Sequence, residues 1–261
     1  MNRITFAVAL CGLLMVGFAQ ADDCRPQLPK LLDQAYPGQA QGQQLHDERG
    51  NFWLSAELSI CKVWPARPHL TLLAVSLMRT EENGYGESDL EVLVLDSISQ
   101  TIVARHVEPN LLDWDAIFVY GLEIDTAPYR LREGDLAFGI RVKRRNMSRP
   151  NPVYETSLSL YELQSQRLRS VLSGLVMESS GGEWDTRCAG QFTETKGLLV
   201  ITEHAGNKGY HDLLLKQKRV ESRMAEVAGE CKSVEESTRR VQFRLEYDEL
   251  RYLLPIEFSP V

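Results

Sequence analysis

The sequence predicts an all-β protein of repeated four-stranded antiparallel meanders, arranged as a propeller-like stack or a two-sheet sandwich, with a short N-terminal helix. Apolar and polar residues alternate through most of the chain after residue 50, which is the pattern of half-buried strands. Turn signals interrupt this alternation at hairpin spacing. They are Asn83-Gly84, Gly134-Asp135, Gly181-Gly182 and Asn207-Lys208-Gly209. The order of motifs also repeats along the chain, which is typical of repeated β-units.

Residues 1–21 predict a secretory signal peptide. Arg3 precedes an uncharged apolar run that ends in the small-residue tripeptide Ala19-Gln20-Ala21. This run is too short to span a bilayer, and no second long apolar run follows it. We therefore expect a soluble mature protein that begins near Asp22, is periplasmic or secreted, and has no transmembrane anchor.

The charge of the chain limits its partners. The formal net charge is −7 at pH 7, and removal of Arg3 with the signal peptide makes the mature chain one unit more acidic. Nucleic acids and anionic membrane surfaces are therefore not expected as partners. A basic protein would be favoured electrostatically, although ordinary solubility requires a charge of similar size.

The cysteines predict two disulfide bonds. Cys11 lies within the signal peptide, which leaves Cys24, Cys61, Cys188 and Cys231 in the mature chain. An even number of cysteines in an exported protein favours a disulfide framework. Four cysteines allow three connectivities, and the shortest loops pair Cys24 with Cys61 and Cys188 with Cys231.

The elements follow in order. Residues 22–50 form an N-terminal segment in which residues 28–36 predict a short helix, ended by Pro37-Gly38. Residues 51–261 form the repeated β domain, with units at about 52–109, 114–172 and 184–254. Val220, Met224 and Val227 fall at helical spacing, but continuation of the preceding strand is equally compatible with so short a run.

The repeat is clearest in the second and third units. Each contains a Trp-Asp pair, a glycine, an acidic residue followed by Thr, an Asp-Leu step and a closing hairpin. In the second unit these are Trp114-Asp115, Gly121, Asp125-Thr126, Asp135-Leu136 and residues 157–172. In the third they are Trp184-Asp185, Gly190, Glu194-Thr195, Asp212-Leu213 and residues 241–255. Residues 84–90 are a degraded copy of the later Gly-Tyr-x-Asp-Leu step.

The Gly-Tyr-x-Asp-Leu step at residues 209–213, with its following strand and Tyr-Asp hairpin, resembles the repeats of FG-GAP-type propeller proteins. That family holds calcium on loops with Asp at alternate positions. Only Asp113-x-Asp115 approaches this pattern, so the resemblance implies no calcium site here. The whole chain also resembles uncharacterised exported bacterial proteins with a Cys-Lys-Val-Trp-Pro segment, here residues 61–65, and this resemblance implies no activity.

No complete catalytic or metal-binding motif occurs. The sequence lacks a G-x-S-x-G elbow, an H-E-x-x-H motif and the close Cys or His spacings of zinc sites, so we predict no catalytic residue, metal or cofactor. Several carboxylates could supply the acid and base of an envelope hydrolase acting on glycan or peptide. They are Asp113, Asp115, Asp125, Asp185 and Glu194. Because an Asp recurs beside a Trp in two units, we favour a structural role in which it binds loop amides.

The predicted contact surface is a loop that comes directly after the basic cluster Lys143-Arg144-Arg145 in the chain. Such a cluster at a strand end is typical of a solvated edge. The proline-bearing loop after it, residues 146–152, is a better candidate, since loops commonly carry recognition. The predicted binding residues are Arg145, Asn146, Arg149 and Asn151. The four tryptophans, Trp53, Trp64, Trp114 and Trp184, are expected to pack between sheets rather than to form a stacking platform.

The sequence therefore favours a disulfide-bonded periplasmic β-protein that binds a protein or another envelope component. Inhibitor, immunity and envelope-interaction roles all fit this prediction. An envelope hydrolase and a structural scaffold are the alternatives.

Overall fold

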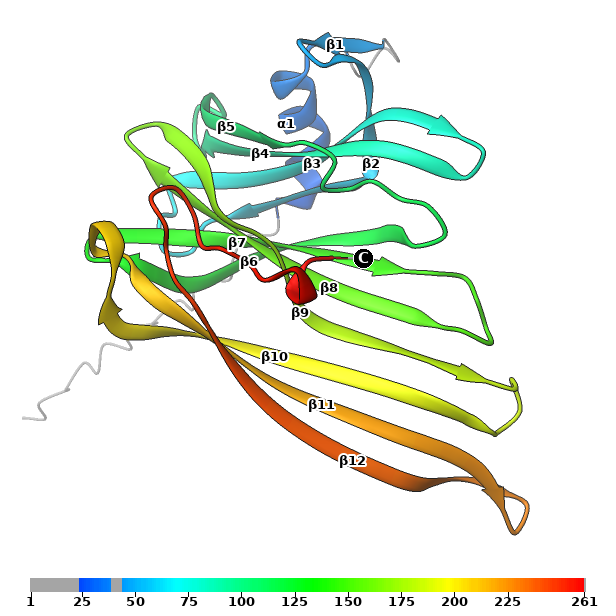
Figure 1. Ribbon diagram of the computed structural model, residues 1–261. Coiled ribbons are helices and arrows are strands. Elements are labelled where there is room, and N and C mark those ends of the chain that lie inside the picture. The colour runs from blue at the N-terminus through cyan, green and yellow to red at the C-terminus, as the bar shows by residue number, and fades with distance from the viewer. Residues whose placement is uncertain (1–23, 39–43, 261) are drawn as a thin grey trace, which may run out of the picture.

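The structure of the protein is a computed structural model that describes residues 24–38 and 44–260. It is an all-β, sandwich-like fold with a five-stranded and a seven-stranded antiparallel sheet and a short N-terminal α-helix (Figure 1). The predicted all-β class is confirmed, and of the two predicted arrangements the structure has the sandwich. The predicted signal peptide lies outside the described residues, and the proposed unit boundaries stay a prediction.

The first sheet contains five strands in chain order. They are β1 (Leu45–Asp47), β2 (Gly50–Val63), β3 (Leu70–Glu82), β4 (Tyr85–Asp96) and β5 (Ile102–Glu108). The predicted helix, α1 (Leu28–Ala35), follows the short 3-10 helix η1 (Arg25–Gln27) and has a proline in its first turn. Its residues Leu31 and Leu32 pack on Leu73 and Leu93, so α1 covers the outer face of this sheet.

The second sheet contains the remaining seven strands, also in chain order. They are β6 (Phe118–Arg132), β7 (Asp135–Arg145), β8 (Val153–Gln164), β9 (Arg167–Trp184), β10 (Gly190–Ala205), β11 (His211–Val227) and β12 (Glu230–Leu245). The 3-10 helix η3 (Asn207–Gly209) joins β10 to β11, and η4 (Ile256–Phe258) follows β12. The segment that contains Val220 and Met224 is thus strand, because it pairs with β10 and β12.

The main core lies between the two sheets. Trp64 has 0% of its surface exposed and packs edge-on against Phe138 of β7, with ring centroids 5.2 Å apart. Leu72 and Val92 of the first sheet and Ile140 of the second belong to the same cluster. Each large apolar side chain buried in this way stabilises the fold by about 1.5–3 kcal/mol. Strand β2 lies beside β6 and β5 beside β9, which aligns the sheets.

A second core lies on the opposite face of β8 and β9. Strand β9 pairs with β10 only through Glu178–Trp184, so the rest of β10 diverges from β9. Strands β11 and β12 and the C-terminal segment then cover the outer face of β8 and β9, where Leu160 and Leu172 pack with Leu215 and Phe258. In Figure 1 the C-terminal segment lies in front of β8 and β9.

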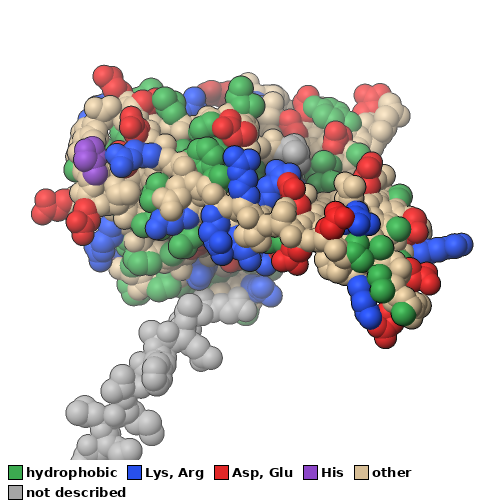
Figure 2. Space-filling model, turned by 60° about the horizontal axis from the view of Figure 1, so that its bottom comes forward, with side chains coloured by type: hydrophobic (Ala, Val, Ile, Leu, Met, Phe, Trp, Pro, Cys, Tyr) green, Lys and Arg blue, Asp and Glu red, His purple; other side chains and the backbone are tan. Residues whose placement is uncertain are grey.

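The opposite ends of β10–β12 form an arm, which comprises Gly190–Lys196, Lys218–Val227 and Glu230–Arg240. In β12, every residue of Glu230–Arg240 is exposed. Acidic and basic side chains are mixed on the part of the molecule that projects to the right in Figure 2. The arm therefore buries little apolar surface, and local contacts hold it together.

Two disulfide bonds join elements that are distant in the chain. Cys24 bonds Cys61, which ties the residue before η1 to β2, and Cys188 bonds Cys231 at the tip of the arm. Their Cα atoms are 5.8 Å and 5.4 Å apart, respectively. These are the pairs that the shortest loops predict. Within the described ranges, no helix is long and apolar enough to cross a membrane.

The two disulfides are expected to stabilise different parts of the protein. Replacing Cys24 and Cys61 by Ser should lower the free energy of global unfolding by about 4 kcal/mol, since the bond closes a long loop. The Cys188–Cys231 bond closes a loop of similar length, so its loss should lower global stability on the same scale. Replacing Cys188 and Cys231 by Ser should in addition accelerate amide hydrogen exchange in the arm, because its exposed strands can open locally. Exchange mass spectrometry with thermal unfolding checks both. Equal acceleration of arm exchange in the two variants would contradict this assignment.

Candidate binding groove between the sheets

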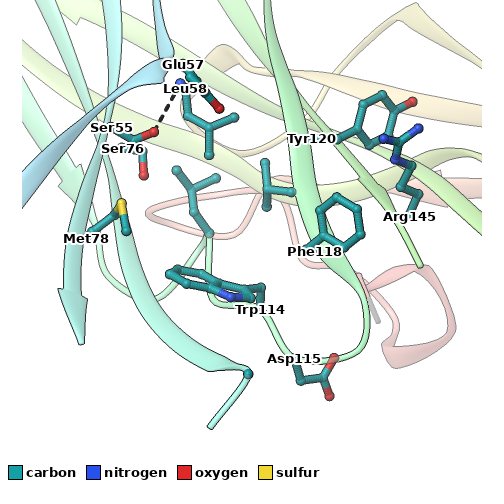
Figure 3. Close-up of a pocket in the computed structure, with 13 residues that line it drawn as sticks. Ser55, Glu57, Leu58, Ser76, Met78, Trp114, Asp115, Phe118, Tyr120 and Arg145 are labelled. Carbon is teal, nitrogen blue, oxygen red and sulfur yellow. Dashed lines mark hydrogen bonds between the residues drawn. The ribbon is translucent and has the colours of Figure 1, made fainter. Parts of the chain in front are cut away.

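A groove of about 710 Å³ opens between the two sheets, where β2 and β3 face the first residues of β6 (Figure 3). Its size falls in the usual range of ligand sites. The apolar lining consists of Leu58, Met78, Leu112, Trp114, Phe118 and Val119. The polar lining consists of Ser55, Glu57, Ser76, Asp115, Tyr120 and Arg145, and Gly84 completes the wall.

Trp114 is held in the groove by a short non-local bridge. Its backbone N–H donates to the carbonyl of Gly86, and the N–H of Gly86 donates to the carbonyl of Trp114, both at 2.9 Å. The indole lies so close to Gly86 that a Cβ added there would be 2.0 Å from a ring carbon. Glycine is therefore required at position 86 for the indole to lie in this place.

A bulge in β2 forms the opposite wall. The pairing of β2 with β3 shifts between Ser55 and Ser59, so the intervening residues leave the ladder. The N–H of Leu58 donates to Ser55 Oγ at 3.3 Å, and Ser59 Oγ donates to the Ser55 carbonyl at 2.6 Å. These bonds fix the bulge that places Glu57 and Leu58 in the lining.

Arg145 is the cation of the lining and lies beside Tyr120 at one end of the groove (Figure 3). It is the register partner of Phe118, and its guanidinium carbon lies 5.6 Å from the Phe118 ring centroid and 5.0 Å from that of Tyr120. Both distances suit cation–π attraction. The Nε of Arg145 is buried and has no hydrogen-bond partner among the described residues. A buried donor of this kind gains free energy when an acceptor reaches it.

The basic cluster is not the uniformly solvated edge that the sequence predicts. Arg144 is only 4% exposed, and its guanidinium donates to Ser157 Oγ and to the Leu111 carbonyl. Burial lowers the pKa of Arg144, while the charge of Glu155 opposes that shift. The side chain points into the sandwich because Arg144 follows the buried Val142 at the two-residue period of a strand.

The predicted loop stands next to the groove, since it follows Arg145 directly. Asn146 closes it: its Nδ2 donates to the Asn151 carbonyl at 2.8 Å, and its Oδ1 accepts from the N–H of Val153 at 3.0 Å. The Arg149 carbonyl accepts from Trp184 Nε1 at 2.5 Å. Of the four predicted binding residues, only Arg145 lines the groove. The binding roles of Asn146, Arg149 and Asn151 stay predictions.

The tryptophans divide between core and surface. Trp64 packs between the sheets as predicted, whereas Trp53 is 47% exposed and does not. Trp114 and Trp184 are half-buried. Phe52 packs beneath α1, so Trp53 points to the opposite face of β2, on the same side as its register partner Met78, which lines the groove.

The carboxylates beside the tryptophans bind backbone amides. Asp115 Oδ1 accepts from the N–H of Ile117 at 2.8 Å. Asp185 Oδ1 accepts from the N–H groups of Arg187 and Cys188 at 2.9 Å and 2.8 Å, and these bonds lower the pKa of Asp185. Such contacts within a turn are those that the structural interpretation predicts. Among the described residues, no group of three His, Cys, Asp or Glu side chains is suited to a metal ion.

Asp125 and Glu194 form ion pairs away from the groove. Asp125 Oδ2 accepts from Tyr129 at 2.8 Å and from Arg141 Nη2 at 2.7 Å. Burial acts to raise the pKa of Asp125, but these donors and the N–H of Ala127 outweigh it and lower the pKa. Glu194 pairs with Lys196 at 2.6 Å. Asp113 Oδ1 accepts from the N–H of Ser88 at 2.8 Å. The five predicted carboxylates therefore bind different partners and do not form one site.

Sequence reasoning missed the groove as a unit. Trp114, Asp115 and Arg145 were candidates, but Leu58, Phe118 and Tyr120 were not, because strand positions do not reveal which edges face each other. The glycine at position 86 could have indicated a close side-chain contact, although its partner Trp114 is distant in the chain. Comparison of the chain with protein-family models, curated proteins and solved structures finds no match.

Gly86→Ala should displace the Trp114 indole from the groove. The added methyl group overlaps the ring, so we expect destabilisation of about 1–3 kcal/mol and a shifted tryptophan emission spectrum. Gly121→Ala is the matched control, since nothing lies within 4 Å of its added Cβ, and it should change stability by about 0.5 kcal/mol or less. Identical spectra and melting temperatures for the two variants would refute the contact.

Asp125 should contribute to stability in a pH-dependent way. Its folded-state pKa is lowered, so its contribution is present above the unfolded pKa of about 3.9 and is lost as the pH falls through the folded pKa. The melting-temperature difference between the wild type and Asp125→Asn should therefore shrink between pH 6 and pH 3. Glu183→Gln, which removes an exposed carboxylate from β9, serves as the control. A difference that stays constant with pH would contradict the ion pair.

Proposed function

We propose that this is an exported protein that binds a protein partner through the groove and the adjacent loop at residues 146–152. Two disulfide bonds support export, because such bonds form and persist in oxidising compartments. A periplasmic or secreted location and a cleaved signal peptide are part of this proposal. The partner would be an extended peptide segment that presents one acidic group to Arg145 and at least one large apolar side chain to the rest of the lining.

Arg145 is the observation that carries the proposal. It combines a cation, two flanking aromatic rings and a buried N–H for which residues 24–38 and 44–260 supply no acceptor, beside an apolar lining. Rigid aromatic and arginine side chains commonly dominate the energy of protein interfaces. An acidic group of the partner would bond Arg145, and its apolar side chain would cover Trp114 and Phe118.

The carboxylates in the lining favour a peptide over a ligand such as a fatty acid, which offers only one negative charge and an apolar chain. Glu57 and Asp115 line the groove at a distance from Arg145, so the groove presents both signs of charge (Figure 3). A peptide can present acidic, apolar and amide groups together, which suits such a surface. Inhibitor, immunity and envelope-interaction roles all require recognition of this kind. The hydrolase and scaffold alternatives stay predictions, and no contact described above favours them.

Selection from a displayed library of random peptides on residues 22–261 tests the proposal. Enriched peptides should contain Phe, Tyr or Leu close to Asp or Glu. Arg145→Gln should weaken the binding of a selected peptide by about tenfold or more, since a hydrogen bond to a charged group contributes about 1.5–3 kcal/mol. Fluorescence anisotropy with a synthetic peptide measures this loss.

Arg239→Gln is the control, because it removes the same charge from an exposed position of β12 in the arm. Equal affinities of the Arg145 and Arg239 variants would refute a role of the groove. Arg149→Gln tests the loop separately: weaker binding would support its contact with the partner, and unchanged binding would confine recognition to the groove.

A further inference from the structure

A second cavity, of about 690 Å³, lies at the other end of the second sheet. Strand β6 runs from Phe118 at the groove to Arg132 at this cavity, so the two sites are at opposite ends of one strand. The turns around Ser165, Lys208 and Glu249 enclose it, and they gather at the left in Figure 1. These turns belong to the Gly-Tyr-x-Asp-Leu step and the two closing hairpins that the sequence singles out.

A buried polar network forms the base of the cavity. Glu162 is 1% exposed, and its Oε2 accepts from Arg169 Nη2 at 2.8 Å and from the Tyr210 hydroxyl at 2.6 Å. The Tyr210 ring stacks on Tyr247 with centroids 3.8 Å apart, and Arg169 Nη1 donates to the Tyr247 hydroxyl at 2.9 Å. Arg132 lies 4.9 Å from the Tyr210 ring centroid. Several mutual contacts thus hold Arg169 and both tyrosines in place.

The charges that line this cavity are not fully compensated. Arg132 pairs with Asp135, and Arg169 pairs with Glu162. Arg167, which is exposed, has no ion-pair partner in the described part of the chain, and Lys208 Nζ donates to the Glu249 carbonyl at 2.8 Å. The exposed side chain of Glu249 also lines the cavity. The lining therefore contains four cations and one carboxylate, Glu249, while Asp135, Glu162 and Asp248 lie next to it, beside Arg132, Arg169 and Lys208 respectively.

Arg169 also carries an unused donor. Its Nε is buried and has no hydrogen-bond partner within the described residues. An unpartnered buried N–H on a side chain that lines a cavity with four cations is suited to an acceptor that is itself negative. Arginine presents a planar fork to carboxylate and phosphate oxygens, while lysine adds a compact point charge.

We propose that this cavity binds an oxyanion, a phosphate or carboxylate group carried on a larger ligand, held by Arg167, Arg169 and Lys208. The volume exceeds that of the anionic group alone, so the rest of the ligand would lie along Gln164 and Tyr247. This site is separate from the groove, and either site can be tested without the other.

Thermal unfolding and isothermal titration calorimetry with sodium phosphate and sodium citrate test the proposal. Each salt is used at low millimolar concentration and compared with sodium chloride at equal ionic strength, because concentrated phosphate or citrate stabilises proteins without a binding site. At least one anion should raise the melting temperature above that in chloride. A response to phosphate alone would point to a phosphorylated ligand, and a response to citrate alone to a carboxylated one.

The double variant Arg167→Gln, Lys208→Gln should bind the effective anion about tenfold or more weakly, because charge-assisted hydrogen bonds contribute on that scale. The matched control is Lys218→Gln, Arg240→Gln, which removes two exposed cations from the arm. It should bind as the wild type does. The proposal is overturned if neither anion stabilises the protein beyond chloride, or if both double variants lose affinity equally.

Discussion

Burial of β8 and β9 on both faces is the constraint on which the rest of the fold depends. One face of these strands packs against the first sheet, and the other packs against β11, β12 and the C-terminal segment. The middle of β8 is accordingly a continuous run of buried positions. Its polar members need internal partners, and Ser159 Oγ accepts from the N–H of Gly174 at 3.0 Å. A strand exposed on one face would require neither feature.

Both candidate sites arise where this layered arrangement ends. The groove forms where β2 and β6 separate beyond the main core, and the bulge of β2 widens the gap. The cationic cavity forms where β10 has left β9 and the turns of the outer layer meet those of the inner layer. The core thus supplies rigid walls, while turns and bulges supply the polar groups, which is the usual division in binding proteins.

Local patterns predicted much of the secondary structure. Alternation identified the strand segments, Pro37-Gly38 ended the helix, and loop length selected the disulfide pairs. The remaining features depend on contacts between residues that are distant in the chain. The alternation of β10 does not reveal that its pairing with β9 stops at Lys196, and the sequence around Trp114 does not reveal that its partner is Gly86. The basic run Lys143-Arg144-Arg145 predicts an exposed strand end, but the alternation of side chains along β7 directs Arg144 into the interior.

The Cys188–Cys231 bond has a consequence for the pairing of the arm. Hydrophobic burial normally fixes strand register, because a slip by one residue moves every apolar side chain to the wrong face. The exposed residues of β12 give little such discrimination, so several alignments with β11 would have similar energies. A covalent bond between Cys188 and Cys231 restricts these alignments to those that keep the two cysteines adjacent. In a reducing compartment the arm would lack this restriction, and oxidation would select its final alignment.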